Sequence, residues 1–541
     1  MTATLVTLAV VVSACSGGDD AQPPASTSSP PATTAPTLAP APETSGDVAP
    51  TAFIPTGIVT NIDFTPSPTS PLAGWLTVTT IRPAAISGTL AAGGHILELA
   101  PSPAATEHRF PVVGLHPGER YRLTVTARRS NTDNRANAII DTTALPDDFP
   151  PITATGQAGD GGWTVFAASS ASRNNYLVAL DATGTVAWYY RVTGGRPAAV
   201  YPTDAGLRYL AEPNYGREID LLGTTVREWR ARPAEAGEPD ADHPIVTVDV
   251  DGMYRSLLEL PSGSMATLSV TPTDVTYDES PCPAGQILEN ETTRVVADTL
   301  VTFDGVDGSA GLTWSTLDLY DPATVPGWGI CTSASFLSRI PGAREWSLAG
   351  ALSYDEETGA VIIPYRFLDA IVAVQAESGL FSPAGSVSWR FGLGQPIAPA
   401  EADAFSGVSS AVKTPDGLIA YDAGTNRAGR YSRSVEYEFD PVGSTAIRRW
   451  DYRRPTADGT ARIQSTFGSI DILDDTTYLV VEGSRPPEVT NPDNPLETRA
   501  SFVEVDRDRV VALEVVVGAP GESWVIDDAV RMPAPVPSDQ P

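Results

Sequence analysis

The sequence predicts an all-β protein in which a six-bladed β-propeller follows a small β-sandwich domain. Gly and Pro supply 46 and 49 of the 541 residues, which is too many helix breakers for a helical bundle. Short runs that alternate apolar and polar residues occupy the part before residue 147, as in half-buried strands. Beyond residue 150 a hairpin turn recurs at roughly regular intervals, which is typical of a repeat architecture.

Charge and composition exclude two classes of function. The chain has 66 acidic residues against 35 Lys and Arg, a formal net charge of -31, and this charge repels phosphate backbones. We therefore expect no nucleic-acid partner. It contains only four His and no HExxH, CxxC or EF-hand spacing, so we expect neither a metal centre nor another cofactor.

The first fifty residues predict export and attachment to a membrane. An apolar run over residues 5–12 is far shorter than the roughly 18 residues that span a bilayer. It leads into Cys15 in a sequence that resembles a bacterial lipobox. We expect residues 1–14 to be a lipoprotein signal peptide and Cys15 to carry the lipid; an ordinary secretory signal that contains a Cys is the alternative.

The segment after Cys15 predicts a tether. Residues 15–50 are mostly Ala, Pro, Ser and Thr, a composition that cannot bury enough apolar surface to order itself. We expect a disordered linker that holds a folded body outside the cytoplasm, in the cell envelope of a bacterium, anchored to the membrane by lipid. A short disordered tail is expected over residues 531–541.

Residues 51–147 predict the small sandwich. Alternation is clearest over 74–80, 95–99 and 121–126. Residues 114–121 resemble the turn before strand F of fibronectin type III domains, where a tyrosine, here Tyr121, pins the connection. We therefore expect a fibronectin III/Ig-like sandwich. Three of the four His lie in this domain, where we expect structural roles: His95, His108 and His116.

Residues 148–530 predict the propeller. Hairpin turns recur at 202–206, 260–263, 355–359 and 414–417, with a weaker copy at 473–477. A second hairpin follows each turn, so one repeat holds four strands. Several of these second hairpins end near a tryptophan that is expected to fill the wedge between neighbours: Trp188, Trp229, Trp389 and Trp450. Six blades are expected to start near Gly162, Ala198, Tyr254, Trp346, Phe405 and Thr466.

An insertion over about residues 270–344 lengthens one repeat. It contains Cys282 and Cys331, which remain once Cys15 is assigned to the lipid. An oxidising compartment permits a disulfide between them, and two free buried thiols are an equal alternative.

Three stretches resemble the bacterial arylsulfotransferases: residues 145–152, 176–191 and 430–440. The resemblance extends from about residue 52 to 530. It implies an N-terminal β-domain, a six-bladed propeller, and transfer of a sulfuryl group from a phenol ester to another phenol. It also implies a site in the central channel, where the family has a nucleophilic His, further His residues, an Asn and a sulfate-binding Arg.

The positions that the resemblance assigns to this chemistry hold other residues. Arg255 stands in the family's His-His-Asp stretch, Leu348 and Gly350 stand for a His and an Asn, and Ser409 stands for the nucleophilic His. Arg366 matches the sulfate-binding Arg. Without the nucleophile and its helpers the covalent route is lost, so we assign no catalytic residue.

The sequence therefore predicts a non-catalytic, arylsulfotransferase-like propeller that binds a small anionic or aromatic molecule in its channel. We expect the channel to be lined by Tyr254, Arg255, Arg366, Ser409 and Ser410. In the alternative interpretation, Arg255 and Arg366 pair with Asp251 or Asp369 and bind nothing.

Two other functions remain open. One is an active arylsulfotransferase with a rewired site, for which His243, from the acidic loop 238–243, would have to reach the channel as a base. A solvated loop is the simpler expectation for this segment. The other is a structural or partner-binding envelope lipoprotein.

Overall fold

The computed structural model describes residues 52–535 apart from 171, 173, 233–241, 283–285, 333–338, 380–381, 428–430, 441–443, 455–467, 484–498, 520–521 and 523. The described residues all belong to one unit, Gly46–Pro541. The signal peptide, Cys15, the linker and residues 536–541 of the predicted tail lie outside them. In the described part, no helix has the length and apolar character needed to cross a membrane.

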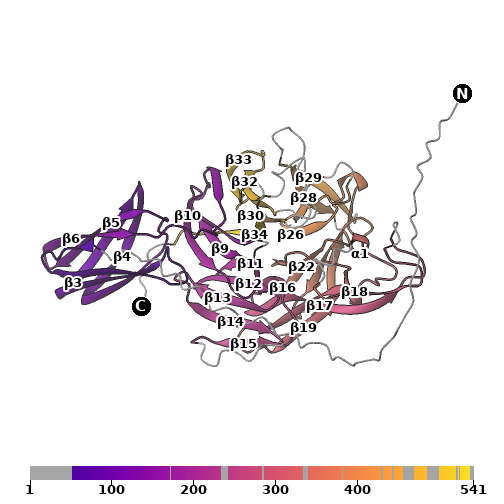
Figure 1. Ribbon diagram of the computed structural model, residues 1–541. Helices are drawn as coiled ribbons and strands as arrows, with labels where there is room; N and C mark the ends of the chain where they lie inside the picture. Colours follow the sequence, from indigo (N-terminus) through magenta and orange to yellow (C-terminus); the bar gives the residue numbers. More distant parts are fainter. Residues whose placement is uncertain are drawn as a thin grey trace, which may run out of the picture. The chain divides into compact units, whose positions relative to one another are not determined.

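The described chain is almost entirely β, which confirms the predicted all-β class (Figure 1). Its helical segments are single turns: η1 (Thr316–Asp318), α1 (Gly329–Thr332) and η2 (Glu401–Asp403).

One six-stranded sheet forms from the residues predicted to be the small domain. Its strands are β1 (Ala52–Phe53), β2 (Val59–Pro66), β3 (Gly74–Ala92), β4 (His95–Val112), β5 (Arg120–Arg129) and β6 (Thr132–Asp141). The order is β1-β6-β5-β3-β2, and β4 pairs with β3. In β5, every second residue from Tyr121 to Ala127 is buried, so one face of the sheet covers a core. The Tyr121 hydroxyl accepts the His116 amide at 2.9 Å, the kind of bond expected at this corner.

Six further sheets follow, each with four or five strands. The first contains β8 (Trp163–Ser170), β9 (Asn175–Leu180), β10 (Val186–Arg191) and β34 (Trp524–Met532). The second contains β11 (Arg196–Pro202), β12 (Gly206–Glu212), β13 (Tyr215–Asp220), β14 (Thr225–Ala231) and β15 (Ile245–Val248). The third contains β16 (Tyr254–Glu259), β17 (Ser264–Thr276), β18 (Thr292–Asp304), β19 (Ala310–Ser315) and β20 (Arg344–Glu345).

The remaining three sheets repeat this plan. The fourth contains β21 (Ser353–Asp355), β22 (Ala360–Tyr365), β23 (Ala370–Gln375) and β24 (Val387–Phe391). The fifth contains β25 (Ala398–Pro399), β26 (Val408–Thr414), β27 (Gly417–Asp422), β28 (Arg433–Asp440) and β29 (Thr445–Tyr452). The sixth contains β30 (Gly468–Ile472), β31 (Thr477–Glu482), β32 (Ala500–Asp506), β33 (Val511–Val517) and β7 (Ile152–Gly156).

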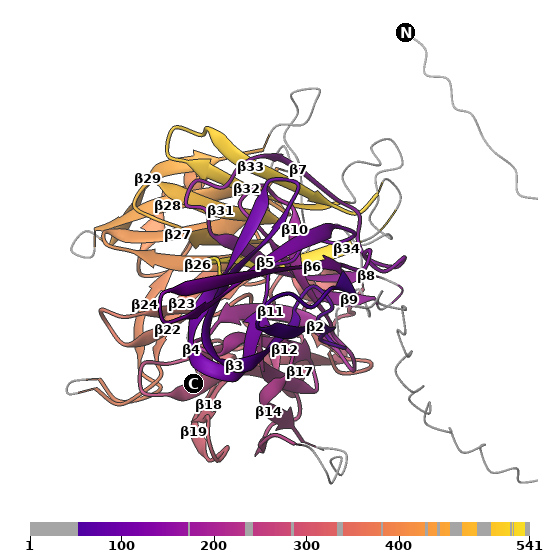
Figure 2. The same ribbon diagram turned by 90° about the vertical axis from the view of Figure 1, so that its left-hand side faces the viewer.

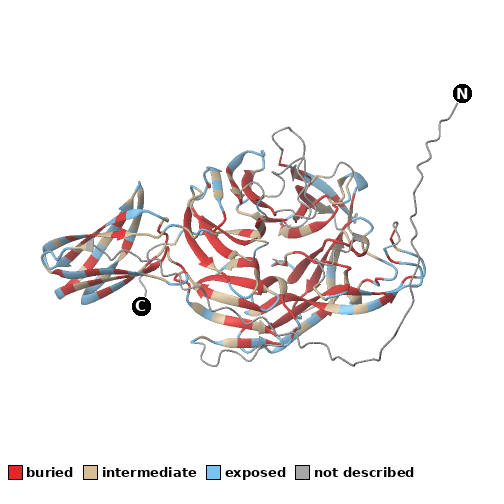
Figure 3. Ribbon diagram, in the orientation of Figure 1, coloured by how far each residue is buried: buried red, intermediate tan, exposed pale blue. Residues whose placement is uncertain are grey.

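The middle strands of these sheets are buried on both faces (Figure 3). Every residue of β22 and β23 is buried, in contrast to the alternation in β5, because neighbouring sheets cover both sides. Trp188 and Trp229 lie in the apolar clusters that join the second sheet to the first and to the third. These tryptophans therefore pack between sheets, as their recurrence predicted.

The first strand of the repeat region completes the last sheet, and the last strand completes the first sheet. β7, which comes first in sequence, pairs with β33 of the last sheet (Figure 2), and β34, which comes last, pairs with β8 of the first sheet. The repeat pattern had suggested that each unit supplies its own strands, so this exchange was missed. β34 ends at Met532, two residues beyond the predicted boundary at 530.

The edge strands β34, β11, β16, β21, β26 and β30 lie next to one another in a closed series. The hydroxyl of Ser353 donates to a β26 carbonyl at 2.6 Å, Ser409 donates to a β30 carbonyl at 2.7 Å, and Ser469 donates to a β34 carboxylate at 2.7 Å. The Leu352 amide, just before β21, donates to the Ser256 hydroxyl of β16 at 2.8 Å. Contacts between β34, β11 and β16 complete the series.

The predicted insertion forms a long β17–β18 hairpin and a following segment that a disulfide ties down. Cys282 and Cys331 are bonded, with Cα atoms 5.2 Å apart, which decides between the two alternatives that the sequence left open. Near this disulfide the Trp328 ring packs edge-on against Phe367, 4.5 Å between centroids.

Candidate functional site

A small cavity lies where these edge strands meet. Its volume is about 30 Å³. It is lined by Ala198, Arg255, Leu348, Ala349, Gly350, Ala351, Arg366, Ser409, Gly468, Asp527 and Asp528. Five of these residues, Arg255, Leu348, Gly350, Arg366 and Ser409, occupy positions that the sequence analysis had singled out. They come from three different sheets, so the fold brings together residues that are up to 154 positions apart.

Strand bulges turn side chains toward this cavity. The strand register shifts at Ala198 in β11, around Arg255 in β16, at Ser409 in β26 and at Asp527 and Asp528 in β34. A bulge inserts an extra residue and re-aims its side chain. Arg255 also has a left-handed backbone with φ 64°, a conformation that costs free energy and is often found at functional sites.

Two residues predicted to line the channel do not reach the cavity lining. Tyr254 packs against an apolar cluster, and the Arg339 guanidinium lies 5.1 Å from its ring centroid. The Ser410 hydroxyl is buried and accepts the Ile470 amide at 3.4 Å. Each is the sequence neighbour of a lining residue, and neighbouring residues of a strand point to opposite sides.

Carboxylates and arginines form an ion-pair network along one wall. Arg196 bridges Glu212 at 2.7 Å and Asp527 at 2.6 Å. The Arg255 guanidinium lies 3.6 Å from Asp527, and its backbone amide donates to Glu212 at 2.6 Å. The alternative interpretation paired Arg255 with Asp251 or Asp369, whereas the carboxylate found beside its guanidinium is Asp527. Burial acts to raise the pKa of Glu212, but the two arginines hold it below its usual value. Burial raises the pKa of Asp527 despite the same arginines.

Arg366 directly follows β22 of the fourth sheet. Its side chain is buried, its amide donates to the Leu348 carbonyl at 3.0 Å, and its Nη2 donates to the Thr425 hydroxyl at 3.3 Å. Burial, followed by the charge of Arg255, lowers the pKa of Arg366 to about 10. Asp369 acts in the opposite direction, although burial raises the pKa of that carboxyl itself to about 6. Two guanidinium groups thus share the cavity and repel each other.

Asp528 is the lining residue whose protonation is most open to change. Burial and the nearby Asp471 raise its pKa to about 7, although the hydrogen bond from Ser469 acts to lower it. Its Oδ1 accepts both the Ser469 hydroxyl at 2.7 Å and the Ala529 amide at 3.0 Å. The sequence analysis missed Asp527 and Asp528. The available signal was a pair of adjacent acidic residues inside the otherwise apolar run 524–530.

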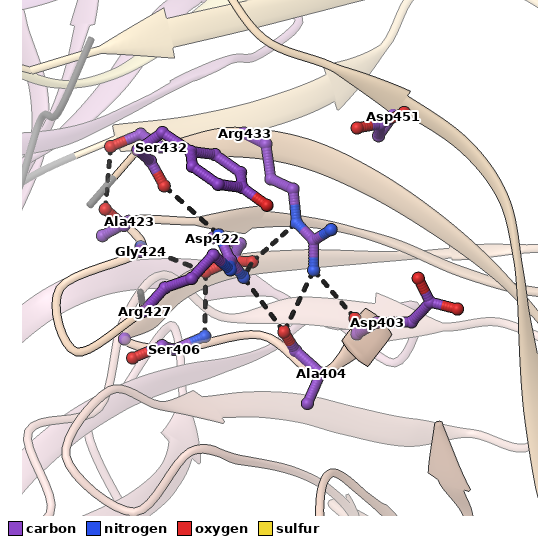
Figure 4. Close-up of polar contacts among 12 residues, drawn as sticks. Asp403, Ala404, Ser406, Asp422, Ala423, Gly424, Arg427, Ser432, Arg433 and Asp451 are labelled. Carbon is purple, nitrogen blue, oxygen red and sulfur yellow. Dashed lines mark hydrogen bonds and ion pairs between the residues drawn. The ribbon is translucent and has the colours of Figure 1, made fainter. Parts of the chain in front are cut away.

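A buried ion-pair cluster holds the loop that leads into β26 (Figure 4). Asp422 accepts the Ser406 amide at 2.9 Å and the Arg433 Nε at 2.9 Å, and it also pairs with Arg427. Arg433 Nη2 donates to the Ala404 carbonyl at 3.0 Å. Arg433 belongs to the stretch 430–440 that carries the family resemblance, so this stretch positions the loop before Ser409.

None of the four histidines lines the cavity. His243 Nε2 lies 3.8 Å from Glu228 of β14, three strands away from β11 in the second sheet. The predicted alternative in which His243 reaches the channel is therefore wrong; residues 238–241 of its loop lie outside the described residues. His116 pairs with Asp181 at 2.9 Å and stacks on His95.

A larger cleft, of about 910 Å³, lies between the fourth and fifth sheets. Trp389 and Phe439 form part of its wall, together with Lys413, the only lysine in the chain. The Lys413 ammonium donates to the Thr414 carbonyl at 2.7 Å and lies 3.7 Å from Glu357. Glu438 and Phe439 of the stretch 430–440 line this cleft, but no position that the resemblance assigns to the sulfuryl chemistry does, so the central cavity is the candidate site.

Comparison with models of protein families shows which family the chain belongs to. A family model described as "Arylsulfotransferase (ASST)" matches residues 152–519, more than half of the chain. The chain belongs to the arylsulfotransferase family. The matched residues include β11, β16, β21, β26 and β30 of the cavity ring, but not β34. Asp527 and Asp528 thus lie outside the part of this arylsulfotransferase family member that the model matches.

Two other comparisons do not bear on the fold or the function of this chain. Comparison with curated proteins finds no relative of this chain. A similar solved structure is that of a putative 6-phosphogluconolactonase from Bacteroides uniformis ATCC 8492, with 10% sequence identity and a TM-score of 0.30. The match covers 83% of this chain and 99% of that one, and a TM-score this low supports no inference about fold or function.

Proposed function

We propose that this arylsulfotransferase family member is a six-bladed β-propeller that binds a small anion in its central cavity and lacks the family's sulfo-histidine chemistry. The closed series of edge strands and the exchange of β7 and β34 support the propeller. The Tyr121 corner bond supports a fibronectin III/Ig-like domain before it.

The convergence of Arg255 and Arg366 on one cavity carries the proposal. Burial and then the charge of Arg255 lower the pKa of Arg366, and an anion held between the two guanidinium groups would offset both effects. Both arginines line the cavity, and we assign the recognition of the ligand chiefly to Arg366, because the resemblance matches it to the family's sulfate-binding Arg.

The size of the cavity favours an anion over an aromatic ring. A volume of about 30 Å³ is far below the roughly 300–1,000 Å³ of pockets that bury an organic ligand. The ligand is therefore a small inorganic anion, or the charged end of a larger molecule whose remainder stays outside the cavity.

The surroundings of Ser409 argue against this residue as a replacement for the family's nucleophilic His. Its hydroxyl donates to the Gly468 carbonyl at 2.7 Å, and no histidine or lysine lines the cavity among the described residues. A serine hydroxyl needs a neighbouring base to attack sulfur. The active, rewired arylsulfotransferase is thus the less favoured function.

We further propose that the protein is held at a membrane outside the cytoplasm through a lipid on Cys15. The lipobox-like sequence and the polar linker 15–50 support this location. The disulfide between Cys282 and Cys331 agrees with an oxidising compartment. A purely structural or partner-binding envelope role is the less favoured function, because it does not account for the convergence of Arg255 and Arg366 on one cavity.

Thermal stabilisation by methyl sulfate tests anion binding. This anion keeps a single charge at every pH used, and the wild type and the variants receive the same amounts of the same salt, so that the general effect of ionic strength cancels between them. We expect a saturable rise in the melting temperature of the wild type. Removing a buried charge partner costs about 2 kcal/mol or more, so Arg366→Gln should weaken binding by roughly 30-fold or more.

Two variants complete this test. Arg366→Lys keeps the positive charge and should retain part of the affinity, whereas Arg449→Gln removes an exposed arginine that pairs with Glu438 on the fifth sheet and should bind like the wild type. Stabilisation that is equal in the wild type and in Arg366→Gln would contradict the proposal.

A further inference from the structure

We infer that Asp528 makes the central cavity take up one proton with each anion, so that the site selects singly charged anions over doubly charged ones. This inference rests on the proposed anion site. It adds the number of protons taken up with each anion and the charge of the anion that the site prefers. The residue that sets both lies on β34, outside the part of the chain matched by the family model.

The position of Asp528 allows it to act on a bound anion. It lines the cavity together with Arg366 and Arg255. The hydrogen bonds from Ser469 and Ala529 both fall on Oδ1, which leaves Oδ2 as the oxygen that can carry a proton. A protonated carboxyl can donate that proton to the anion as a hydrogen bond.

The charges around the cavity explain why a proton is required. Three guanidinium groups, those of Arg196, Arg255 and Arg366, face the carboxyls of Glu212, Asp527 and Asp528. Asp369 acts on Arg366 and Asp471 acts on Asp528 as two further carboxyls, so with all these groups ionised the negative charges already outnumber the positive ones. An added anion increases this uncompensated negative charge, which is costly in a buried site. A proton on Asp528 offsets the charge of a monoanion but not that of a dianion.

The groups that face Asp528 from the packed strands keep its carboxyl easy to protonate. Asp471 of β30 and Asp527 of β34 both repel its ionised form. Tyr201 of β11 also faces it, but burial raises the pKa of that phenol to about 12, so it stays neutral. Asp369, beside Arg366, is a second buried carboxyl that titrates below neutrality, and the experiment must separate its effect.

The pH dependence of methyl sulfate binding tests the inference. Free Asp528 has its pKa raised to about 7, and a bound anion raises it further, so binding takes up a proton. The affinity is then constant below that pKa and falls about tenfold per pH unit above it. We expect binding about 30-fold weaker at a pH of about 8.5 than at about 6, and inorganic sulfate, a dianion throughout, should bind at least about tenfold more weakly than methyl sulfate.

Three variants identify the carboxyl that takes up the proton. Asp528→Asn cannot ionise and should bind methyl sulfate with nearly the same affinity at both pH values. Asp369→Asn should keep the wild-type dependence. Asp471→Asn should keep it with a midpoint at lower pH, because a negative neighbour of Asp528 is gone.

Calorimetry provides a measurement that needs no variant. Titrations of the wild type at a pH of about 8 in buffers of different ionisation enthalpy should show close to one proton taken up per anion. Binding with no proton uptake, or an unchanged pH dependence in Asp528→Asn, would overturn the inference and leave the anion site standing. No binding at any pH would overturn the anion site itself.

Discussion

At the scale of single residues, the central cavity shows how much one position matters on a bulged strand. Arg255 and Ser409 line it, while their neighbours Tyr254 and Ser410 pack elsewhere. Counting back from the hairpin turns located the right strands in the sequence. It could not decide which of two adjacent side chains faces inward, because the register shifts at these residues.

The environment of Ser409 predicts that the protein forms no sulfuryl-enzyme. Its hydroxyl is engaged with the Gly468 carbonyl, and no histidine or lysine accompanies it among the described lining residues. Incubation with 4-nitrophenyl sulfate and phenol should release no 4-nitrophenol above the level of a heat-denatured sample. Intact-mass spectrometry should show no sulfuryl adduct, and an adduct that disappears in Ser409→Ala would contradict the account.

At the scale of elements, the exchange of β7 and β34 was the largest feature that the sequence did not reveal. The repeated turns predicted six units and most of their strands. β7 and β33, however, lie more than 350 residues apart in the chain, and a local period carries no information about which distant strand completes a sheet. The two acidic residues that β34 brings to the cavity were missed for the same reason.

Truncation tests the role of β34. A chain ending at residue 519 loses this strand, and with it the Asp527 partner of the buried Arg196. Leaving a buried charge without its partner costs about 3–5 kcal/mol, in addition to the lost strand pairing with β8. We expect urea denaturation to show a loss of at least this size, or no cooperative transition.

A chain ending at residue 535 is the matched control and should unfold like the full-length protein, because it retains all of β34. If the chain ending at 519 were as stable as this control, β34 would not be the strand that closes the ring.

At the scale of the whole molecule, the recurring turns and the stretches 145–152, 176–191 and 430–440 were enough to predict the all-β class and the family. Arg433 shows that such a stretch can mark structure instead of chemistry, because this residue holds the loop before β26 through Asp422. The charge balance of the cavity could not be read from the sequence. It depends on arginines and carboxyls that meet only when the last strand joins the first sheet.

Bromide locates the anion site most directly. It is a single atom with one negative charge, small enough for the central cavity, and it scatters anomalously. In crystals soaked with bromide at a pH of about 6, where Asp528 is protonated for the most part, we expect an anomalous peak in the cavity between the guanidinium groups of Arg255 and Arg366. Peaks confined to the protein surface, with none in the cavity, would contradict the account.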